Sequence, residues 1–250
     1  MEIIVLTEDI AREGFLAEHG VSFLIKHNGK KLLFDTGQSD VFIKNAEKMG
    51  VILDVDAITL SHGHYDHSRG LKYLAGKKLK LIAHPLAFKE QIEEGQNIGT
   101  PMSKEEAQKA FNLIEAVEPY NIFDEVLFLG EVPRESGFEQ NEYNELLDDS
   151  GVVIKTNKGL VVISGCAHSG IVNIIEHSKR VAGIEKVYAV IGGFHLRKTS
   201  QEQIEKTIEY FKEERIEKIM PCHCNDAEAM TAFHNAFEFK KPCAGDVIEL

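Results

Sequence analysis

The densest group of reactive side chains lies in the segment SHGHYDHSRG, residues 61–70, which contains His62, His64, Asp66 and His67. The first two histidines are separated by one residue, so an extended backbone turns both imidazoles to the same side. Asp66 and His67 are adjacent, and in a tight turn they can face a second position. Neutral imidazole and carboxylate are ligands for Zn²⁺ and similar divalent ions. The spacing therefore predicts a metal site in preference to a polar loop of hydrogen-bonded histidines.

Three later histidines each follow an apolar stretch typical of a strand. His168 follows LVVISGCA, His195 follows VYAVIGGF, and His223 follows IEKIMPC. Ligand sites in α/β proteins collect at strand ends. We therefore expect His168 and His223 to be metal ligands, and His195 to be either a ligand or a substrate contact. The trio Cys222-His223-Cys224 is a further candidate, although a lone Cys-x-Cys lacks the paired knuckles of a structural zinc site.

The remaining histidines have weaker contexts. His84 precedes Pro85 and is interpreted as a packing residue or a residue that supports the metal ligands. Four others are interpreted as surface or helix-face residues without chemistry: His19, His27, His177 and His234.

Predicted strands and helices alternate along the chain, which indicates an α/β layered fold. A hairpin is expected at Asn28-Gly29, a strong two-residue turn signal. Residues 86–116 are expected to be rich in helix. Strands are predicted at 2–7, 21–34, 56–60, 79–83, 126–130, 151–156, 160–164, 187–191, 217–220 and 246–249, and helices at 40–49, 170–182, 201–214 and 227–237.

An acidic segment interrupts this pattern at residues 131–150, with seven acidic side chains and one arginine. This composition predicts an exposed loop, and one interpretation is a lid over a site. Phe138 and Tyr143 would then cover a flat ring, or they anchor the loop locally.

Composition narrows the classes of partner. The chain has 250 residues and a formal net charge of −12, so it lacks the positive charge that phosphate backbones require, and nucleic acid is not expected as a partner. No apolar run approaches the roughly 20 residues of a membrane span, and the first residues resemble a strand in place of a signal peptide. We therefore expect a cytoplasmic protein with reduced cysteines that acts on a small molecule.

A candidate anion seat lies after His195. Arg197 and Lys198 precede a predicted helix, at whose start Ser200 and Gln203 fit a capping box. A helix N-terminus beside two cations suits a phosphate or carboxylate, although an ordinary solvated helix start fits equally well. Arg197 and Lys198 are therefore candidates for binding an anionic substrate.

Several segments together resemble one family. SHGHYDHSRG resembles the HxHxDH signature of the metallo-β-lactamase superfamily, and LLFDTG upstream resembles its Asp-Thr-Gly hallmark. GLVVISGCAHSGIVNII, AVIGGFHL and PCHC are similar to its branch of metal-dependent hydrolases, which includes an archaeal dihydropterin–aminobenzene ribosyl-phosphate synthase. The resemblance covers nearly the whole chain. It implies one domain over residues 1–250, an αββα sandwich with its metal site at one edge of two facing sheets.

The resemblance also implies two metal positions. Asp35 would support the cluster through hydrogen bonds. The superfamily's bridging aspartate has no counterpart here, so Cys166 or His195 replaces it, or the second ion is weakly held. The implied ligands are His62, His64 and His168 for one ion, and Asp66, His67 and His223 for the other, with His195 as the alternative to His223 as the last ligand.

Three functions fit these features. The first is a metal-dependent hydrolase acting on a small anionic substrate, in which Asp66 orients the water and His195 protonates a leaving group or stabilises an oxyanion. The second is a pterin-type transferase that uses the same metal site. The third is a non-catalytic metal-binding protein. One or two divalent ions are expected, zinc first, with iron, manganese or nickel as alternatives.

Overall fold

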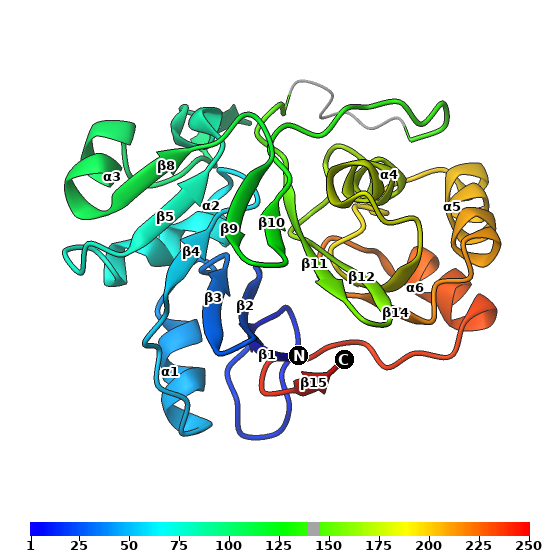
Figure 1. Ribbon diagram of the computed structural model, residues 1–250, viewed down its shortest axis with the longest axis horizontal. Coiled ribbons are helices and arrows are strands. Elements are labelled where there is room, and N and C mark those ends of the chain that lie inside the picture. Colours follow the sequence, from blue (N-terminus) through cyan, green and yellow to red (C-terminus); the bar gives the residue numbers. More distant parts are fainter. Residues whose placement is uncertain (140–145) are drawn as a thin grey trace. The chain divides into compact units, whose positions relative to one another are not determined.

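The chain folds into two compact units, each built on one β-sheet. Figure 1 shows the computed structural model, which describes residues 1–139 and 146–250. The first unit comprises Met1–Val117 and Pro242–Leu250, and the second comprises Glu118–Lys241. The expectation that residues 1–250 form a single domain would require both units to belong to it, and it stays a prediction.

The first unit contains a seven-stranded sheet in the order β15-β1-β2-β3-β4-β5-β8. Strands β3, β4, β5 and β8 run parallel, and the other pairs are antiparallel. The carboxyl ends of parallel strands meet at one edge, which is where Asp35 and the first histidine cluster begin. The strands are β1 (Glu2–Thr7), β2 (Ser22–His27), β3 (Lys30–Phe34), β4 (Ala57–Thr59), β5 (Lys80–Ala83), β8 (Asn112–Glu115) and β15 (Val247–Glu249).

Short helices accompany this sheet. Helix α1 (Val41–Lys48) contacts β1 and buries Phe42 and Ala46 in the unit's core. The predicted hairpin at Asn28-Gly29 is present, and both residues have the positive φ that a type I′ turn requires (47° and 74°). The other elements are α2 (Tyr65–Ser68), η1 (Arg69–Tyr73), η2 (Pro85–Phe88), β6 (Ile92–Glu93), β7 (Gln96–Asn97) and α3 (Lys104–Ala110).

The second unit contains a six-stranded sheet in the order β14-β13-β12-β11-β10-β9, with β12, β13 and β14 parallel. Strands β12 and β13 are buried along their whole length, as expected for strands covered on both faces. Helix α4 contacts β11 and β12, and α5 contacts α6 (Figure 1). The elements are β9 (Tyr120–Phe123), β10 (Val126–Phe128), β11 (Gly151–Thr156), β12 (Gly159–Ser164), α4 (Ile171–Ala182), β13 (Val187–Gly192), α5 (Gln201–Glu213), β14 (Lys218–Pro221) and α6 (Ala227–Ala236).

The predicted α/β class is confirmed, but residues 86–116 were interpreted wrongly. This stretch contains one seven-residue α-helix, α3, most of the short 3-10 helix η2, and the strands β6, β7 and β8. Strand β8 forms because it pairs with β5, about thirty residues earlier in the chain, and such pairing leaves no local pattern. No helix in the described part of the chain is both long and apolar enough to cross a membrane.

The acidic segment at 131–150 is not wholly exposed, which corrects the prediction. Glu139 and Asp149 are buried, because their carboxylates bind backbone N–H groups at the start of α4. Burial raises the pKa of Glu139 to about 7 and that of Asp149 to about 6. Phe138 packs against the second unit's core, which fits the local-anchor interpretation, and Tyr143 lies outside the described residues.

Candidate functional site

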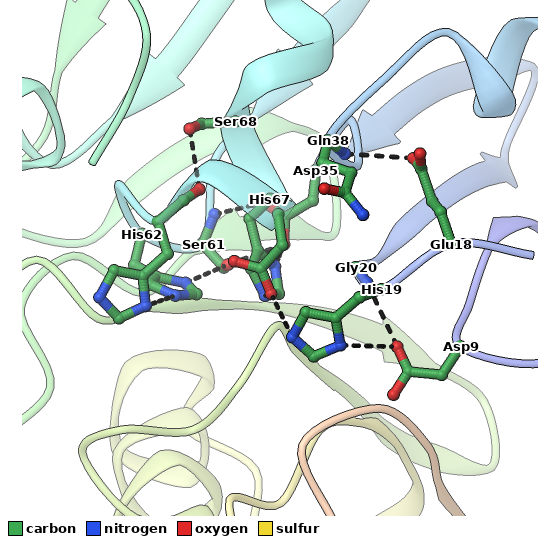
Figure 2. A network of polar contacts seen from close by, with 12 residues as sticks. Asp9, Glu18, His19, Gly20, Asp35, Gln38, Ser61, His62, His67 and Ser68 are labelled. Carbon is green, nitrogen blue, oxygen red and sulfur yellow. Dashed lines mark hydrogen bonds and ion pairs between the residues drawn. The ribbon is translucent and has the colours of Figure 1, made fainter. Parts of the chain in front are cut away.

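Asp35 supports the first histidine cluster, which comprises His62, His64, Asp66 and His67. It is fully buried and has φ 54°, a left-handed conformation that aspartate tolerates better than most residues. Its Oδ1 accepts a hydrogen bond from Ser61 N, and its Oδ2 accepts one from Ser61 Oγ, both at 2.7 Å. Oδ2 also lies 2.7 Å from His67 Nδ1 (Figure 2). Asp35 therefore lies behind the cluster and orients it through its contacts with Ser61 and His67.

The two residues after Asp35 hold the same segment through the backbone. Thr36 donates to the His67 carbonyl from both N (2.7 Å) and Oγ1 (3.0 Å). Gly70 N donates to the Gly37 carbonyl at 3.0 Å. A Cβ at Gly70 would lie 2.1 Å from the Thr36 carbonyl oxygen, so the close approach requires glycine. The Asp-Thr-Gly segment thus acts as a brace for α2.

The four predicted ligands of this cluster come together. Asp66 and His67 lie in the short helix α2, which corrects the expected tight turn, and His64 is its N-cap residue. His62 Nε2 lies 3.0 Å from His64 Nδ1, and the rings of His62 and His67 have centroids 4.3 Å apart. Asp66 Oδ2 lies 3.5 Å from His67 Nε2. All four residues are buried, so their polar atoms must be satisfied inside the protein.

Hydrogen bonding fixes which ring nitrogens face the cluster. Ser61 Oγ donates to Asp35 and therefore accepts from His62 Nδ1, at 2.9 Å. In the same way His67 Nδ1 donates to the Asp35 carboxylate. Both neutral rings then present an unprotonated Nε2 to the cluster, as metal-ligating histidines do. The donor set of three imidazoles and one carboxylate fits a divalent cation such as zinc.

Gly63 lets the loop between His62 and His64 pack closely on η2. A Cβ at Gly63 would lie 2.2 Å from the Ala87 carbonyl oxygen. The single hydroxyl hydrogen of Thr100 is shared between the carbonyl oxygens of Ala87, 2.7 Å from Oγ1, and Gly63, 3.0 Å from Oγ1. His84 caps η2 by accepting a hydrogen bond from Leu86 N. Its suggested support of the metal ligands stays a prediction.

Sequence reasoning missed His19. Its Nε2 lies 3.4 Å from Asp66 Oδ2, and its Nδ1 lies 3.2 Å from Asp9 Oδ1 (Figure 2). His19 belongs to the irregular connection between β1 and β2, where neither periodicity nor a motif marks a single histidine. Only the folded loop brings it beside Asp66.

A second cluster lies at the carboxyl ends of β12, β13 and β14. The ligand atoms of Cys166, His168 and His195 lie within 4.8 Å of one another, and so do those of Cys166, His223 and Cys224. The rings of His168 and His195 have centroids 4.3 Å apart. Because the three strands are parallel and adjacent, their end loops meet at one edge of the sheet.

The backbone of this cluster is strained. Ala167, His195, His223 and Cys224 all have positive φ, between 23° and 61°, although none is glycine. Such conformations cost on the order of 1–3 kcal/mol each and concentrate at functional sites. The surrounding β-sheet therefore holds these end loops in backbone conformations that are unfavourable for the residues in isolation.

Cys224 is the second site residue that sequence reasoning underweighted. A hydrogen bond with the Cys166 thiol, followed by the nearby His223, holds the pKa of the Cys224 thiol well below its usual value. Thiolates and imidazoles together suit zinc and similar soft ions. The second cluster therefore also has donor chemistry that fits a metal.

Comparison with known proteins decides the family. The sequence model of the metallo-beta-lactamase superfamily matches residues 17–223, which include the first cluster and every residue of the second except Cys224. This chain belongs to the metallo-β-lactamase superfamily. The superfamily is metal-dependent, and both clusters contain side chains that could hold a metal ion.

Two relatives of this chain come from Methanocaldococcus jannaschii. An uncharacterized protein is 35% identical, with 98% of this chain and 99% of the relative covered. A 7,8-dihydropterin-6-methyl-4-(beta-D-ribofuranosyl)-aminobenzene-5'-phosphate synthase is 33% identical, with 100% and 96% covered. The crystal structure of Tm1679, named as a metal-dependent hydrolase of the beta-lactamase superfamily, is 33% identical with a TM-score of 0.89 and covers 100% and 99%. The predicted metallo-β-lactamase fold is thereby confirmed.

The candidate anion seat of this superfamily member lies at the start of α5. Ser200 Oγ accepts a hydrogen bond from Gln203 N at 3.3 Å, so the predicted N-cap is confirmed. Arg197 and Lys198 are exposed, and Lys198 N donates to the Asp226 carboxylate at 3.1 Å. Their suggested binding of a substrate anion stays a prediction.

Proposed function

We propose that this member of the superfamily is a metal-dependent enzyme that uses an activated water to hydrolyse a small anionic substrate. The buried set of His62, His64, Asp66 and His67 carries the metal-dependent part of this proposal, and the name of Tm1679, a metal-dependent hydrolase 33% identical to this chain, supports the hydrolytic part. Burial of such a set is costly unless its polar atoms are paired, and its tautomers are oriented for metal binding through Asp35 and Ser61.

The chain's own residues have separate roles in this reaction. A divalent cation, when bound, lowers the pKa of a water ligand from about 15.7 to about 7 and polarises a substrate oxygen. Asp66 orients the attacking water or is itself a ligand. His195 protonates the leaving group or stabilises negative charge on a substrate oxygen.

The proposed ligands extend to the second cluster. We propose His168 and His223 as ligands, with Cys166 or His195 in place of the superfamily's bridging aspartate. Nitrogen and sulfur donors favour zinc over magnesium or calcium. The allotment of the six ligands to two ions follows from the family resemblance and stays a prediction.

The anionic character of the substrate rests on the start of α5. Arg197 and Lys198 are exposed there, beside the N-terminal end of a 13-residue helix. That end carries partial positive charge, so a phosphate or carboxylate is the substrate group that it would bind.

Metal content and turnover test the proposal together. Wild-type protein loaded with zinc is expected to hold at least one equivalent per chain and to hydrolyse some member of a panel of phosphoesters, lactones, thioesters and β-lactams. His67→Ala is expected to lose metal and turnover together, whereas His234→Ala, on an exposed face of α6, retains both. Bound metal without turnover on any substrate would favour the non-catalytic alternative.

A synthase is the second candidate, because the pterin-forming relative is 33% identical over the entire chain. The same ligands would then assist the departure of a leaving group from a pterin methyl carbon while an arylamine attacks that carbon. Both reactions need a Lewis acid and an oriented nucleophile, so the clusters alone favour neither.

One product assay separates these two functions. The zinc-loaded protein is incubated with a hydroxymethyl-dihydropterin diphosphate and an arylamine ribosyl phosphate, and the products are separated by chromatography. A joined pterin–arylamine product supports the synthase. Release of the free pterin alcohol alone supports hydrolysis and excludes the synthase for this substrate pair.

A further inference from the structure

Two imidazoles flank one carboxylate oxygen of Asp66. His67 Nε2 lies 3.5 Å from Asp66 Oδ2, and His19 Nε2 lies 3.4 Å from the same oxygen. His67 belongs to the same short helix as Asp66, whereas His19 comes from the loop between β1 and β2. The three donor atoms all lie within the first unit.

Each histidine has a carboxylate beside its Nδ1, although the His67–Asp35 pair is buried and the His19–Asp9 pair is exposed. His67 Nδ1 contacts the Asp35 carboxylate at 2.7 Å, and His19 Nδ1 contacts the Asp9 carboxylate at 3.2 Å (Figure 2). A carboxylate on Nδ1 keeps that nitrogen protonated and leaves Nε2 as the lone-pair donor of the neutral ring. His19 therefore repeats the carboxylate–histidine arrangement of a metal ligand.

The distances favour coordination over a simple hydrogen bond. A good N–H···O bond measures about 2.7–3.2 Å, shorter than the 3.4 Å between His19 and Asp66. Neighbouring ligands of a tetrahedral ion with bonds of about 2.0–2.2 Å are separated by about 3.3–3.6 Å. Both separations from Asp66 Oδ2 fall in that interval.

The backbone holds His19 at this place. Gly20 has φ 138°, and a Cβ there would lie 2.2 Å from the Asp66 carbonyl oxygen. Gly20 N donates to Asp9 Oδ1 at 3.2 Å, which also fixes the carboxylate that supports His19. The loop is thus pressed against Asp66 at the residue that follows His19.

We propose that His19 is a metal ligand, together with Asp66 and His67, and that Asp9 orients its ring. This inference rests on the proposed function, in which Asp66 and His67 bind a divalent ion. It supplies a further ligand to a chain in which the family resemblance leaves the bridging aspartate without a counterpart. The competing interpretation is that His19 only contacts the carboxylates of Asp9 and Asp66 and binds no metal.

Cobalt and zinc binding decide between these interpretations. Apo protein is titrated with Co²⁺ while its visible absorption is recorded, and zinc affinity is measured by competition with a chromophoric chelator. The variants are His19→Ala, His19→Gln, Asp9→Asn and His67→Ala, and His27→Ala on β2 is the matched control. His19→Gln retains an amide donor for the carboxylates but cannot replace the imidazole.

If His19 is a ligand, His19→Ala and His19→Gln should each lower the affinity for one metal equivalent more than 100-fold and change the cobalt spectrum. Asp9→Asn should weaken it about 10–100-fold, as expected for a residue that orients a ligand. Wild-type affinity and spectrum in both His19 variants, with loss in His67→Ala, would refute the role of His19 and leave the proposed function standing. Unchanged metal content in His67→Ala would instead refute the proposed function.

Discussion

Replacement of Asp35 by asparagine should weaken metal binding by the first cluster, although it removes none of the proposed ligands. Oδ1 of Asp35 receives the Ser61 backbone N–H, a group that can only donate, so the asparagine oxygen must occupy that position. The amide NH₂ then faces Ser61 Oγ and His67 Nδ1, where Oδ2 was. To accept from this NH₂, His67 must carry its proton on Nε2, which then no longer binds a metal.

The expected magnitude follows from these contacts. Loss of a residue that orients a metal ligand typically costs 10–100-fold in metal affinity. This loss corresponds to about 1.4–2.8 kcal/mol of binding free energy. Asparagine tolerates the positive φ of position 35, so backbone strain should add little.

Zinc affinity by chelator competition measures this effect, and the thermal unfolding of apo protein reports any change in folding. Asp40→Asn is the matched control, because Asp40 pairs with Lys44 at the exposed start of α1. If Asp35→Asn bound zinc within about twofold of wild type, the reasoning about the His67 tautomer would be refuted.

Three further results are expected. The pKa of Glu139 is about 7 in the folded protein and 4.5 in the unfolded chain. The free energy of unfolding should therefore fall by roughly 3 kcal/mol as the pH rises through that window, because the folded protein loses its proton last. Denaturant unfolding at pH 5 and pH 8 should show that Glu139→Gln lacks this contribution, and equal slopes in both proteins would contradict it. Gly63→Ala places a Cβ 2.2 Å from the Ala87 carbonyl oxygen and should cost about 1–3 kcal/mol of stability, whereas Gly137→Ala, with open space around it, should unfold like wild type. Removal of metal by a chelator should lower the unfolding temperature, by the equivalent of about 2.7 kcal/mol when free metal had been 100 times its Kd, and an unchanged temperature would argue against a metal in the folded state.

Local sequence patterns were enough to predict the fold class and most secondary-structure elements of this protein. Apolar stretches of strand length, the Asn28-Gly29 turn and the helical spacing after residue 150 predicted the α/β class and most element positions. The histidine-rich segment at 61–70 and the Asp-Thr-Gly turn at 35–37 indicated the family that comparison then confirmed. These features are readable because they depend on neighbours within a few residues in the chain.

Tertiary structure decided the features whose partners are distant in sequence. His19 acquires a place beside Asp66 only because the loop after β1 folds back onto α2 at Gly20. Cys224 meets Cys166 because β12, β13 and β14 are parallel neighbours, and Glu139 is buried because the start of α4 offers it unpaired N–H groups. His19 and Glu139 are ordinary in their local context, and Cys224 is marked there only by the Cys222-His223-Cys224 trio. Long-range backbone geometry, which no short pattern encodes, converts them into candidate ligands and buried acids.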